Sequence, residues 1–210
     1  MKNIAIFASG EGSNFQSIHH HILSGEILGC IVLAVSNNLN SGAIKYARKN
    51  NISTFIINEI NNLNSVSWEE LLMKELDRNS IDLICLAGYL KLLPKSIINN
   101  YQNKIMNIHP ALLPQFGGKG FYGNKVHEAV IESGIKKSGV TIHFVDEKYD
   151  HGQIIAQEKV KVRIEDTAKS LAARVLKLEH ELYPNVIKAF CENRIIWEDN
   201  HPIIEDAIEN

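Results

Sequence analysis

Apolar residues along the first half of the chain form short continuous runs that alternate with stretches of helical spacing. The runs predict strands, because a strand covered on both faces is apolar along its whole length. They cover residues 3–8, 28–36, 53–57 and 82–87, and a further run ends at Met106. Between them, apolar residues three or four positions apart predict helices, as at Phe15, Ile18 and Ile22. This alternation predicts an α/β fold built on a doubly wound, mostly parallel sheet.

The second half of the chain departs from this alternation. Residues 140–145 alternate in polarity like a strand, and residues 154–162 return after a polar turn, which predicts a short antiparallel pair. Thr167 opens the longest helical stretch, which Pro184 is expected to bend or interrupt. We expect residues 194–197 to add an edge strand.

Length and composition limit what the protein can be. The chain has 210 residues, 45% of them apolar, enough for one substantial domain, which we place at residues 1–197, before an acidic, poorly ordered tail at residues 198–210. A formal net charge of −2 argues against a nucleic-acid partner bound by bulk electrostatics. No apolar run approaches the roughly 20 residues of a membrane span. We therefore expect a cytoplasmic protein with no membrane partner, as a monomer or a homodimer.

No metal centre is expected. Cys30, Cys85 and Cys191 are widely spaced among aliphatic residues, which is typical of reduced core cysteines. The three histidines at residues 19–21 are consecutive, so on a helix they point about 100° apart and cannot converge on an ion. We interpret them as a solvated helix face.

A glycine-containing turn follows the first predicted strand, and we call residues 9–14 the first glycine loop. Gly12, Ser13 and Asn14 stand where a helix begins, so their N–H groups could bind a phosphate at the positive end of the helix dipole. The spacing lacks the third glycine of a dinucleotide site and the lysine of a P-loop, so neither NAD nor ATP is favoured. An ordinary turn with Ser13 as helix cap is an equal alternative.

The chemistry is expected where the chain leaves the sheet between Met106 and Pro110. If strand geometry persists, Asn107 and His109 share one face, and loops at the carboxyl ends of such strands line the ligand crevice. An amide donor beside an imidazole suits a carbonyl carbon under attack, with the amide holding the oxyanion and the imidazole moving a proton. Alternatively, His109 simply caps a loop carbonyl.

Asp150 is the acid that we expect to face His109, where its charge would raise the pKa of the imidazole above about 6.5. It is followed by His151 and Gly152, so a plain turn is the alternative. Residues 117–123, which we call the second glycine loop, are expected to be mobile. They either close over a substrate or carry the chain to a helix near residues 125–132.

These motifs together resemble the folate-dependent phosphoribosylglycinamide formyltransferase family. The resemblance rests on the first glycine loop, on Asn107 to Pro110 with Leu112, Leu113 and Pro114, and on Asp150 with Gly152 after a strand that contains His143. It covers residues 3 to about 197 in order and spacing. It implies a Rossmann-like formyltransferase fold and transfer of the formyl group of 10-formyltetrahydrofolate, the co-substrate, to the amine of glycinamide ribonucleotide, without a metal.

The same resemblance implies a role for each part of the site. Asn107 would hold the formyl oxygen, His109 would act as general acid or proton shuttle, and Asp150 would keep His109 protonated and order water. The substrate would be bound by Gly12, Ser13, Asn14 and Glu179. The folate would be bound by Asn107 and by two segments, which comprise Leu90, Lys91, Leu92, Leu93, Asp146, Glu147, Lys148, Tyr149 and Asp150.

Three features depart from the family pattern. Ser65 stands where the family has a folate-contacting arginine, the second glycine loop is longer and richer in glycine, and Glu11 must point outward from the phosphate loop. Two alternative functions are a 10-formyltetrahydrofolate hydrolase and a non-catalytic nucleotide-binding module. A methionyl-tRNA formyltransferase would need a further domain and a basic surface for which the sequence leaves no room.

Overall fold

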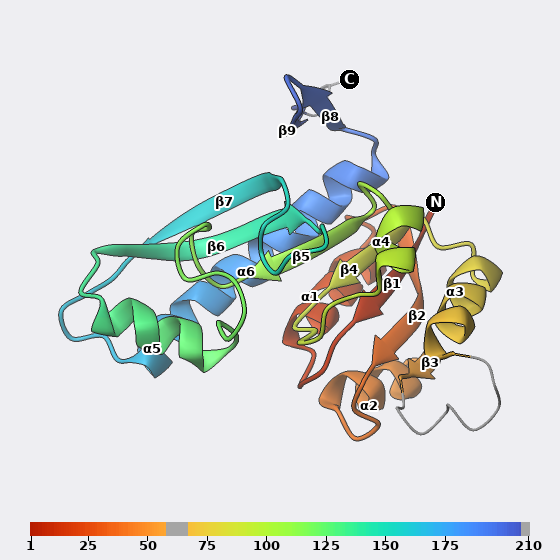
Figure 1. Cartoon of the computed structure of the whole chain (residues 1–210), viewed down its shortest axis with the longest axis horizontal. Coiled ribbons are helices and arrows are strands. Elements are labelled where there is room, and N and C mark those ends of the chain that lie inside the picture. The colour runs from red at the N-terminus through yellow and green to blue at the C-terminus, as the bar shows by residue number, and fades with distance from the viewer. Residues whose placement is uncertain (58–66, 207–210) are drawn as a thin grey trace. The chain divides into compact units, whose positions relative to one another are not determined.

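The computed structural model describes residues 1–57 and 67–206. The main sheet has seven strands in the order β3-β2-β1-β4-β5-β6-β7, and β8 and β9 form a separate pair. The sheet is mostly parallel and flanked by helices, which confirms the predicted fold class (Figure 1). Contacts divide the chain into two compact units, Met1–Met106 and Asn107–Asn210.

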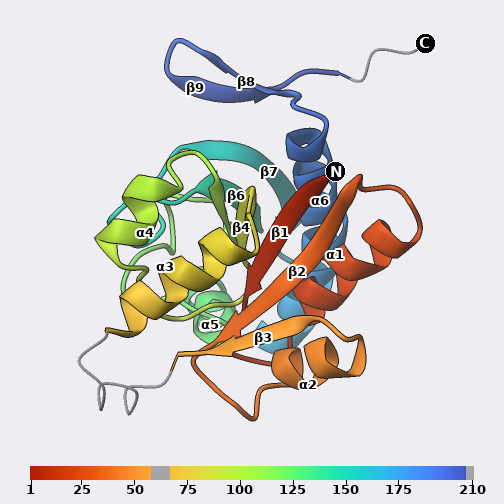
Figure 2. The same ribbon diagram turned by 90° about the vertical axis from the view of Figure 1, so that its right-hand side faces the viewer.

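The first unit is a parallel sheet with helices on both faces. Its strands are β1 (Lys2–Phe7), β2 (Gly29–Ser36), β3 (Ser53–Ile56) and β4 (Leu83–Leu86), and its helices are α1 (Ser13–Leu23), α2 (Gly42–Lys49), α3 (Trp68–Arg78) and α4 (Lys95–Asn100). Strand β1 pairs in parallel with both β2 and β4, and β2 pairs in parallel with β3. Figure 2 shows α1 and α2 on one side of these strands and α3 and α4 on the other.

The chain order reverses between β1 and β4, because β2 and β3 lie on one side of β1 and β4 on the other. Crevices at such switch points are the usual ligand sites of open α/β sheets. The strands around this point are buried on both faces, as their continuous apolar runs predict. Fully buried side chains of this core include Ile4, Ile6, Phe7, Phe15, Ile18, Leu33, Ile44, Leu72, Leu76, Leu83 and Ile84.

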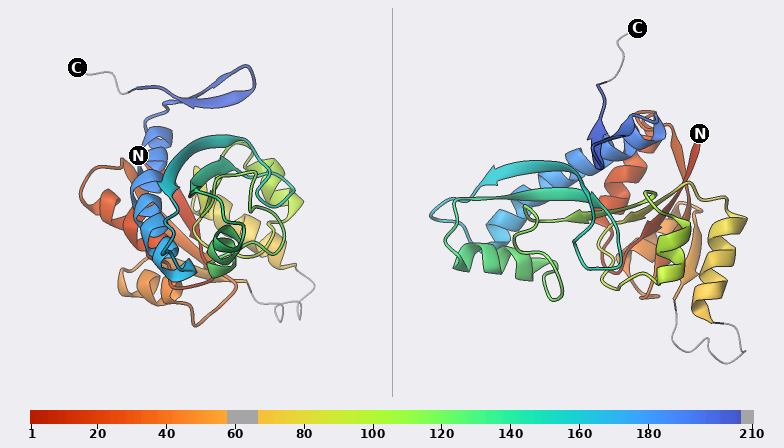
Figure 3. Two further views of the ribbon diagram at one scale, coloured as in Figure 1. Left: turned by 90° about the vertical axis from the view of Figure 1, so that its left-hand side faces the viewer. Right: turned by 45° about the horizontal axis from the view of Figure 1, so that its top comes forward.

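The second unit is built around an antiparallel pair and one long helix. Its elements are the end of β5 (Ile105–His109), α5 (Asn124–Glu132), β6 (Lys137–Phe144), β7 (Ile154–Lys161), α6 (Ala168–Cys191), β8 (Ile195–Glu198) and β9 (His201–Ile204). Strands β6 and β7 pair antiparallel, as predicted. Figure 3 shows α6 running along this pair, with α5 near its start.

Helix α6 begins after Thr167, as predicted, and the side chain of Thr167 caps its start by accepting a hydrogen bond from Ser170 N. Pro184 lies inside this helix and does not interrupt it. Two predictions about the region that follows are wrong. Strand β8 pairs with β9 rather than with an edge of the main sheet. Residues 201–204, expected in a poorly ordered tail, form β9, and the ring of Trp197 stacks on that of Phe144 at 5.6 Å.

Smaller corrections concern one helix start and the histidine run. Helix α1 is capped by Gly12 rather than by Ser13. His19 is not simply solvated, because its Nδ1 lies 2.9 Å from the hydroxyl of Tyr46. The predicted loop at residues 58–65, including Ser65, lies outside the described residues.

Candidate active site

Asp150 lies against the other two residues that are predicted to carry the chemistry, Asn107 and His109. Its Oδ1 accepts a hydrogen bond from the side-chain amide of Asn107 at 3.3 Å, and its Oδ2 lies 3.5 Å from His109 Nδ1. The side chains of His109 and Asp150 are 4% and 10% exposed, so water screens the interaction weakly. The amide, the imidazole and the carboxylate thus converge within the second unit.

Local backbone geometry explains this convergence. Strand β5 continues through His109, so Asn107 and His109 project from the same face of the strand, as predicted. Asp150 lies at the end of the turn between β6 and β7 with φ 52°, in the left-handed region that most side chains avoid. Such a conformation is held by surrounding contacts, and it is common at functional sites.

Both ring nitrogens of His109 face acceptors of the protein. Nε2 lies 2.8 Å from the main-chain oxygen of Phe116 and must donate to it, because a carbonyl oxygen only accepts. Nδ1 faces the carboxylate of Asp150. These two contacts favour the charged imidazolium over the neutral ring.

Burial affects the pKa of His109 more than these two contacts do, and it lowers that pKa below the ordinary value of 6.5. The Asp150 charge and the Phe116 carbonyl raise the pKa, and His143 lowers it, but the net shift is downward. The prediction that Asp150 raises this pKa above its usual value is therefore wrong, because desolvation outweighs the carboxylate. Burial therefore favours the neutral ring, and the two ring contacts oppose it.

The carboxyl group of Asp150 shows the opposite balance. Burial alone would raise its pKa, but the nearby ring of His109 and the N–H of Gly118 are among the groups that lower it below its ordinary value of 3.8. Gly118 N donates to Asp150 Oδ2 at 2.9 Å. Asp150 is therefore a carboxylate throughout the neutral pH range.

The main chain at the start of the second glycine loop holds the pair from both ends. The Phe116 carbonyl binds His109 and the Gly118 amide binds Asp150, while Gly117 lies between them. A Cβ on Gly117 would lie 2.4 Å from Leu113 Cδ2 and 3.2 Å from Asp150 Cβ. Only glycine fits this close approach without a shift of the neighbours.

Sequence alone gives no role to His127 or to the carbonyl of Phe116. His127 lies on α5 and is 4% exposed, and its Nδ1 has no hydrogen-bond partner among the described residues. Burial, and then the charge of His109, lowers the pKa of His127 to about 4. The spacing of apolar residues cannot reveal that His127 is buried near His109, because its position on α5 looks like any other buried position of a helix.

The first glycine loop lies at the switch point of the first unit. Gly12 has φ 77°, and a Cβ there would lie 2.9 Å from both Cα and Cβ of Ala43. The loop therefore packs directly on the start of α2, and Ala43 N donates to Gly10 O at 3.1 Å. The N–H groups at the start of α1 point out of the helix, which is the arrangement of an anion site. Glu11 is exposed, as predicted.

Ser9 is a second residue that the sequence does not single out. Its hydroxyl donates to Asn37 Oδ1 at 2.7 Å and accepts from Leu90 N at 3.1 Å, and its own N–H donates to Gly88 O. Ser9 thereby joins the loops that follow β1, β2 and β4. These are the loops that line a crevice at a switch point.

The two predicted folate segments lie in different units. In the first unit, Leu90 and Leu92 are 48% and 45% exposed, whereas Leu93 is buried in the core. In the second unit, the turn at residues 146–150 is shaped by Asp146, which accepts from Lys148 N at 2.8 Å and contacts His151 Nδ1 at 2.6 Å. Glu179 is buried on α6 at 9% exposure.

The part of the chain that the structure describes holds neither a metal cluster nor a membrane-spanning helix. Within residues 1–57 and 67–206, no cluster of three or more His, Cys, Asp or Glu side chains is arranged to hold a metal ion. Across the same residues, none of the helices combines the length and the apolar character needed to span a bilayer.

The fold and the site together define an α/β protein in which a side-chain amide, an imidazole and a carboxylate lie against one another. The family model described as formyl transferase matches residues 2–187. The chain therefore belongs to the formyl transferase family.

Individual relatives narrow this assignment. The chain is 47% identical over 205 residues to the chloroplastic phosphoribosylglycinamide formyltransferase of Vigna unguiculata and 48% identical over 208 residues to that of Arabidopsis thaliana. These matches cover 97% and 98% of the chain but 66% and 71% of the plant proteins.

The crystal structure of glycinamide ribonucleotide transformylase 1 from Symbiobacterium toebii superposes with a TM-score of 0.89 at 32% identity, covering 98% of this chain and 95% of that one. The chain thus groups with the phosphoribosylglycinamide formyltransferases. Its function is formyl transfer in purine biosynthesis.

Proposed function

We propose that the chain transfers the formyl group of 10-formyltetrahydrofolate to the primary amine of glycinamide ribonucleotide, with Asn107, His109 and Asp150 as its catalytic residues. The observation that carries the proposal is the position of the Asp150 carboxylate, which contacts the Asn107 amide with one oxygen and faces the His109 ring with the other. Names of the relatives support the nucleotide acceptor and the purine pathway.

The reaction requires that a proton move from the amine of the nucleotide to N10 of the folate. The amine attacks the formyl carbon, a C–N bond forms, and the carbonyl electron pair moves to oxygen. The oxygen then returns its electron pair to re-form the carbonyl, the bond from carbon to N10 of the folate breaks with its electron pair on N10, and a proton lost by the amine ends there. No other reactant is required, so the protein must hold the oxygen and carry the proton.

His109 suits the role of proton carrier. Burial lowers its pKa and so favours the neutral ring, the form that takes the proton that the amine releases. The imidazolium that forms is stabilised by Asp150 at 3.5 Å and by the Phe116 carbonyl at 2.8 Å. In this role, Asp150 stabilises His109 after it gains the proton rather than keeping it protonated beforehand.

Asn107 would donate an N–H to the formyl oxygen as negative charge develops on it. The nucleotide phosphate would bind Gly12, Ser13 and Asn14, where the start of α1 favours an anion, and Glu179 would bind the ribose or glycinamide end. The folate would contact residues 90–93, with the exposed Leu90 and Leu92, and residues 146–150. The reaction needs no metal ion.

An assay with both substrates tests this proposal. The protein is mixed with 10-formyltetrahydrofolate, with and without glycinamide ribonucleotide, and folate deformylation and the formylated nucleotide are both measured. We expect deformylation only with the nucleotide, and one formylated product for each folate consumed. Consumption independent of the nucleotide would instead assign the hydrolase reaction, and no consumption would leave only the nucleotide-binding alternative.

We also propose that this reaction takes place in the cytoplasm, by a monomer or a homodimer that binds neither nucleic acid nor membranes. The net charge of −2 supports the absence of a nucleic-acid partner. The plant relatives are named as chloroplastic, so cell fractionation is the test of location. Recovery with an organelle or membrane fraction would contradict it.

A further inference from the structure

His143 is a buried histidine whose ring touches the candidate active site but has no role in the chemistry proposed above. It lies near the end of β6, and its side chain is 2% exposed. Its Nδ1 lies 2.7 Å from the main-chain oxygen of Phe144, and its Nε2 lies 3.0 Å from Asn107 Nδ2. Both ring nitrogens are therefore committed to contacts within the second unit.

The partners of this ring fix where its hydrogens are. The Phe144 oxygen only accepts, so His143 Nδ1 carries a hydrogen and donates it. The Asp150 carboxylate also only accepts, so the end of the Asn107 amide that faces it must be the NH₂ group. His143 Nε2 faces that same NH₂ group and must be the acceptor of its other hydrogen.

The two hydrogen bonds of the Asn107 amide differ in length. The bond to His143 is 3.0 Å, close to ideal, whereas the bond to Asp150 is 3.3 Å, beyond the normal range for N–H···O bonds. His143 therefore anchors the amide through one hydrogen. The second hydrogen is held loosely and is the one that can turn to an oxyanion.

The fold places the His143 ring by means of an irregularity in the sheet. The register between β6 and β7 shifts between Ile142 and His143, so that His143 pairs with Ile154 and Ile142 with Ala156. Irregularities of this kind re-aim side chains and are common beside active sites. A Cβ on Gly152 would lie 1.9 Å from the Phe144 oxygen, so glycine is required where the chain passes the carbonyl that binds His143.

We propose that His143 is the positioning residue of Asn107: by accepting one amide hydrogen, it fixes the NH₂ end toward the reacting centre and leaves the other hydrogen for the formyl oxygen. This inference rests on the proposed function, because it assigns the oxyanion to Asn107. This role needs no contact between the ring and either substrate. At 3.7 Å its Nε2 is too far from Asp150 Oδ1 for a direct hydrogen bond.

A double-mutant cycle separates this role from simple packing. We expect His143→Leu to lower kcat by about 10- to 100-fold, with the KM for the nucleotide changed less than about twofold, as for loss of an interaction made in the transition state. In an Asn107→Ala background, the same substitution should lower kcat by less than about threefold, because the positioned amide is already gone. His143→Gln, which offers an amide oxygen in place of Nε2, should restore most of the lost kcat.

His127→Leu is the matched control, since His127 is also buried and belongs to the same unit but has no hydrogen bond to Asn107 among the described contacts. Its effect on kcat should be the same in the wild-type background and in the Asn107→Ala background. Equal losses from His143→Leu in both backgrounds, or wild-type kcat in that variant, would overturn the proposal. If His143→Leu does not fold, His143→Gln decides: it must keep kcat within about tenfold of wild type, since its oxygen still accepts the amide hydrogen.

Side-chain NMR makes the test independent of catalysis. One Asn107 amide hydrogen should exchange slowly in the wild type and in His143→Gln, and fast in His143→Leu. Fast exchange of both hydrogens in the wild type would contradict the contact. If instead the wild type shows the slow hydrogen but no nucleotide-dependent formyl transfer, the proposed function fails while the contact stands.

Discussion

The two glycine loops look alike in sequence but make different contacts in the structure. The first, residues 9–14, starts a helix, and its glycine with positive φ lets the chain pack against α2. The second, residues 117–123, holds a side chain together with the residue before it: the carbonyl of Phe116 binds His109, and the amide of Gly118 binds Asp150. Glycine thus lets the start of α1 lie against α2 in the first loop, and in the second it brings main chain against Asp150.

The same substitution, glycine to alanine, is therefore expected to have opposite kinetic effects in the two loops. Changes in the first loop should weaken nucleotide binding and leave the chemical step intact. Changes at the start of the second loop should slow the chemical step and leave nucleotide binding intact. The distinction appears as a split between KM and kcat.

A large effect, of the same order as loss of the Asp150 carboxylate, is expected for Gly117→Ala. The added methyl group would lie 2.4 Å from Leu113 Cδ2 and 3.2 Å from Asp150 Cβ, so either the Leu113 side chain or the loop beside Asp150 must move. Displacement of catalytic groups by about 1 Å can lower turnover by about 100-fold. We expect kcat to fall by about that factor, measured by steady-state kinetics, with the KM for the nucleotide nearly unchanged.

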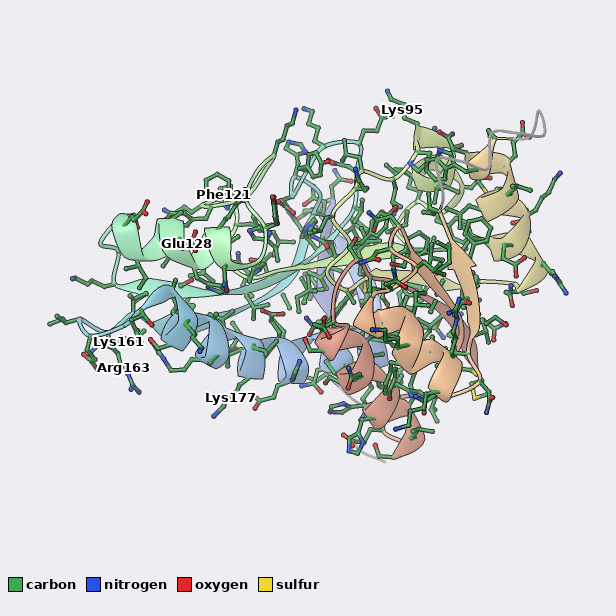
Figure 4. All side chains as sticks on the ribbon, turned by 90° about the horizontal axis from the view of Figure 1, so that it is seen from below. Lys95, Phe121, Glu128, Lys161, Arg163 and Lys177 are labelled. Atoms are coloured by element: carbon green, nitrogen blue, oxygen red, sulfur yellow. The ribbon has the colours of Figure 1, made fainter. Side chains whose placement is uncertain are left out.

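The control for Gly117→Ala is Lys119→Ala, which changes an exposed side chain of the same loop. Its kcat should stay within about twofold of wild type, as for most surface substitutions. A second control is Lys177→Ala, because Lys177 projects outward from α6 (Figure 4). If Gly117→Ala turned over as fast as either control, the second loop would not hold the catalytic pair.

A smaller effect is expected for Gly12→Ala. An alanine at φ 77° costs about 1–2 kcal/mol, and its Cβ would press on Ala43 at 2.9 Å. A distorted cradle should raise the KM for glycinamide ribonucleotide by about tenfold, which corresponds to about 1.4 kcal/mol, and keep kcat within about threefold. A fall in kcat with KM unchanged would remove the first loop from phosphate binding.

Much of this arrangement follows from the sequence. The continuous apolar runs of β1 and β4 predict a sheet buried on both faces, and strand geometry through His109 places it beside Asn107. Asp150 could be predicted as the acid because it lies in the turn between β6 and β7, two segments whose sequence predicts an antiparallel pair. In each case, local pattern and final geometry agree.

The rest depends on tertiary contacts that no local pattern encodes. The pKa of His109 is set by how deeply the ring is buried, which its neighbours in sequence do not reveal. His143 reaches Asn107 only because the register of β6 and β7 shifts beside it. Residues 201–204 look like part of an acidic tail, but they pair with β8 and form a hairpin.

The smallest expected effect is on stability and concerns His127. This residue lies on α5, the helix that follows the second glycine loop, and we give it no role in the chemistry. Its pKa is lowered from 6.5 to about 4, so between pH 6.5 and 4 the unfolded chain binds a proton at this ring and the folded protein does not. The stability that the neutral ring contributes is present above pH 6.5 and is lost as the pH falls toward 4. Urea unfolding should show this slope in the wild type.

Substitution tests the source of that slope. In His127→Gln the dependence between pH 6.5 and 4 should be shallower, whereas His201→Gln, at an exposed position of β9, should keep the wild-type slope. An unchanged slope in His127→Gln would show that other groups cause the acid sensitivity.

The most direct test of the account is the turnover of Asp150→Asn, with nucleotide binding measured in parallel by calorimetry. Loss of the carboxylate leaves the His109 imidazolium without its stabilising charge, so we expect kcat to fall by at least about 100-fold. The affinity for glycinamide ribonucleotide should stay within about threefold of wild type, because the phosphate cradle is untouched. Turnover close to wild type in a folded Asp150→Asn variant would contradict the claim that this carboxylate organises the chemistry.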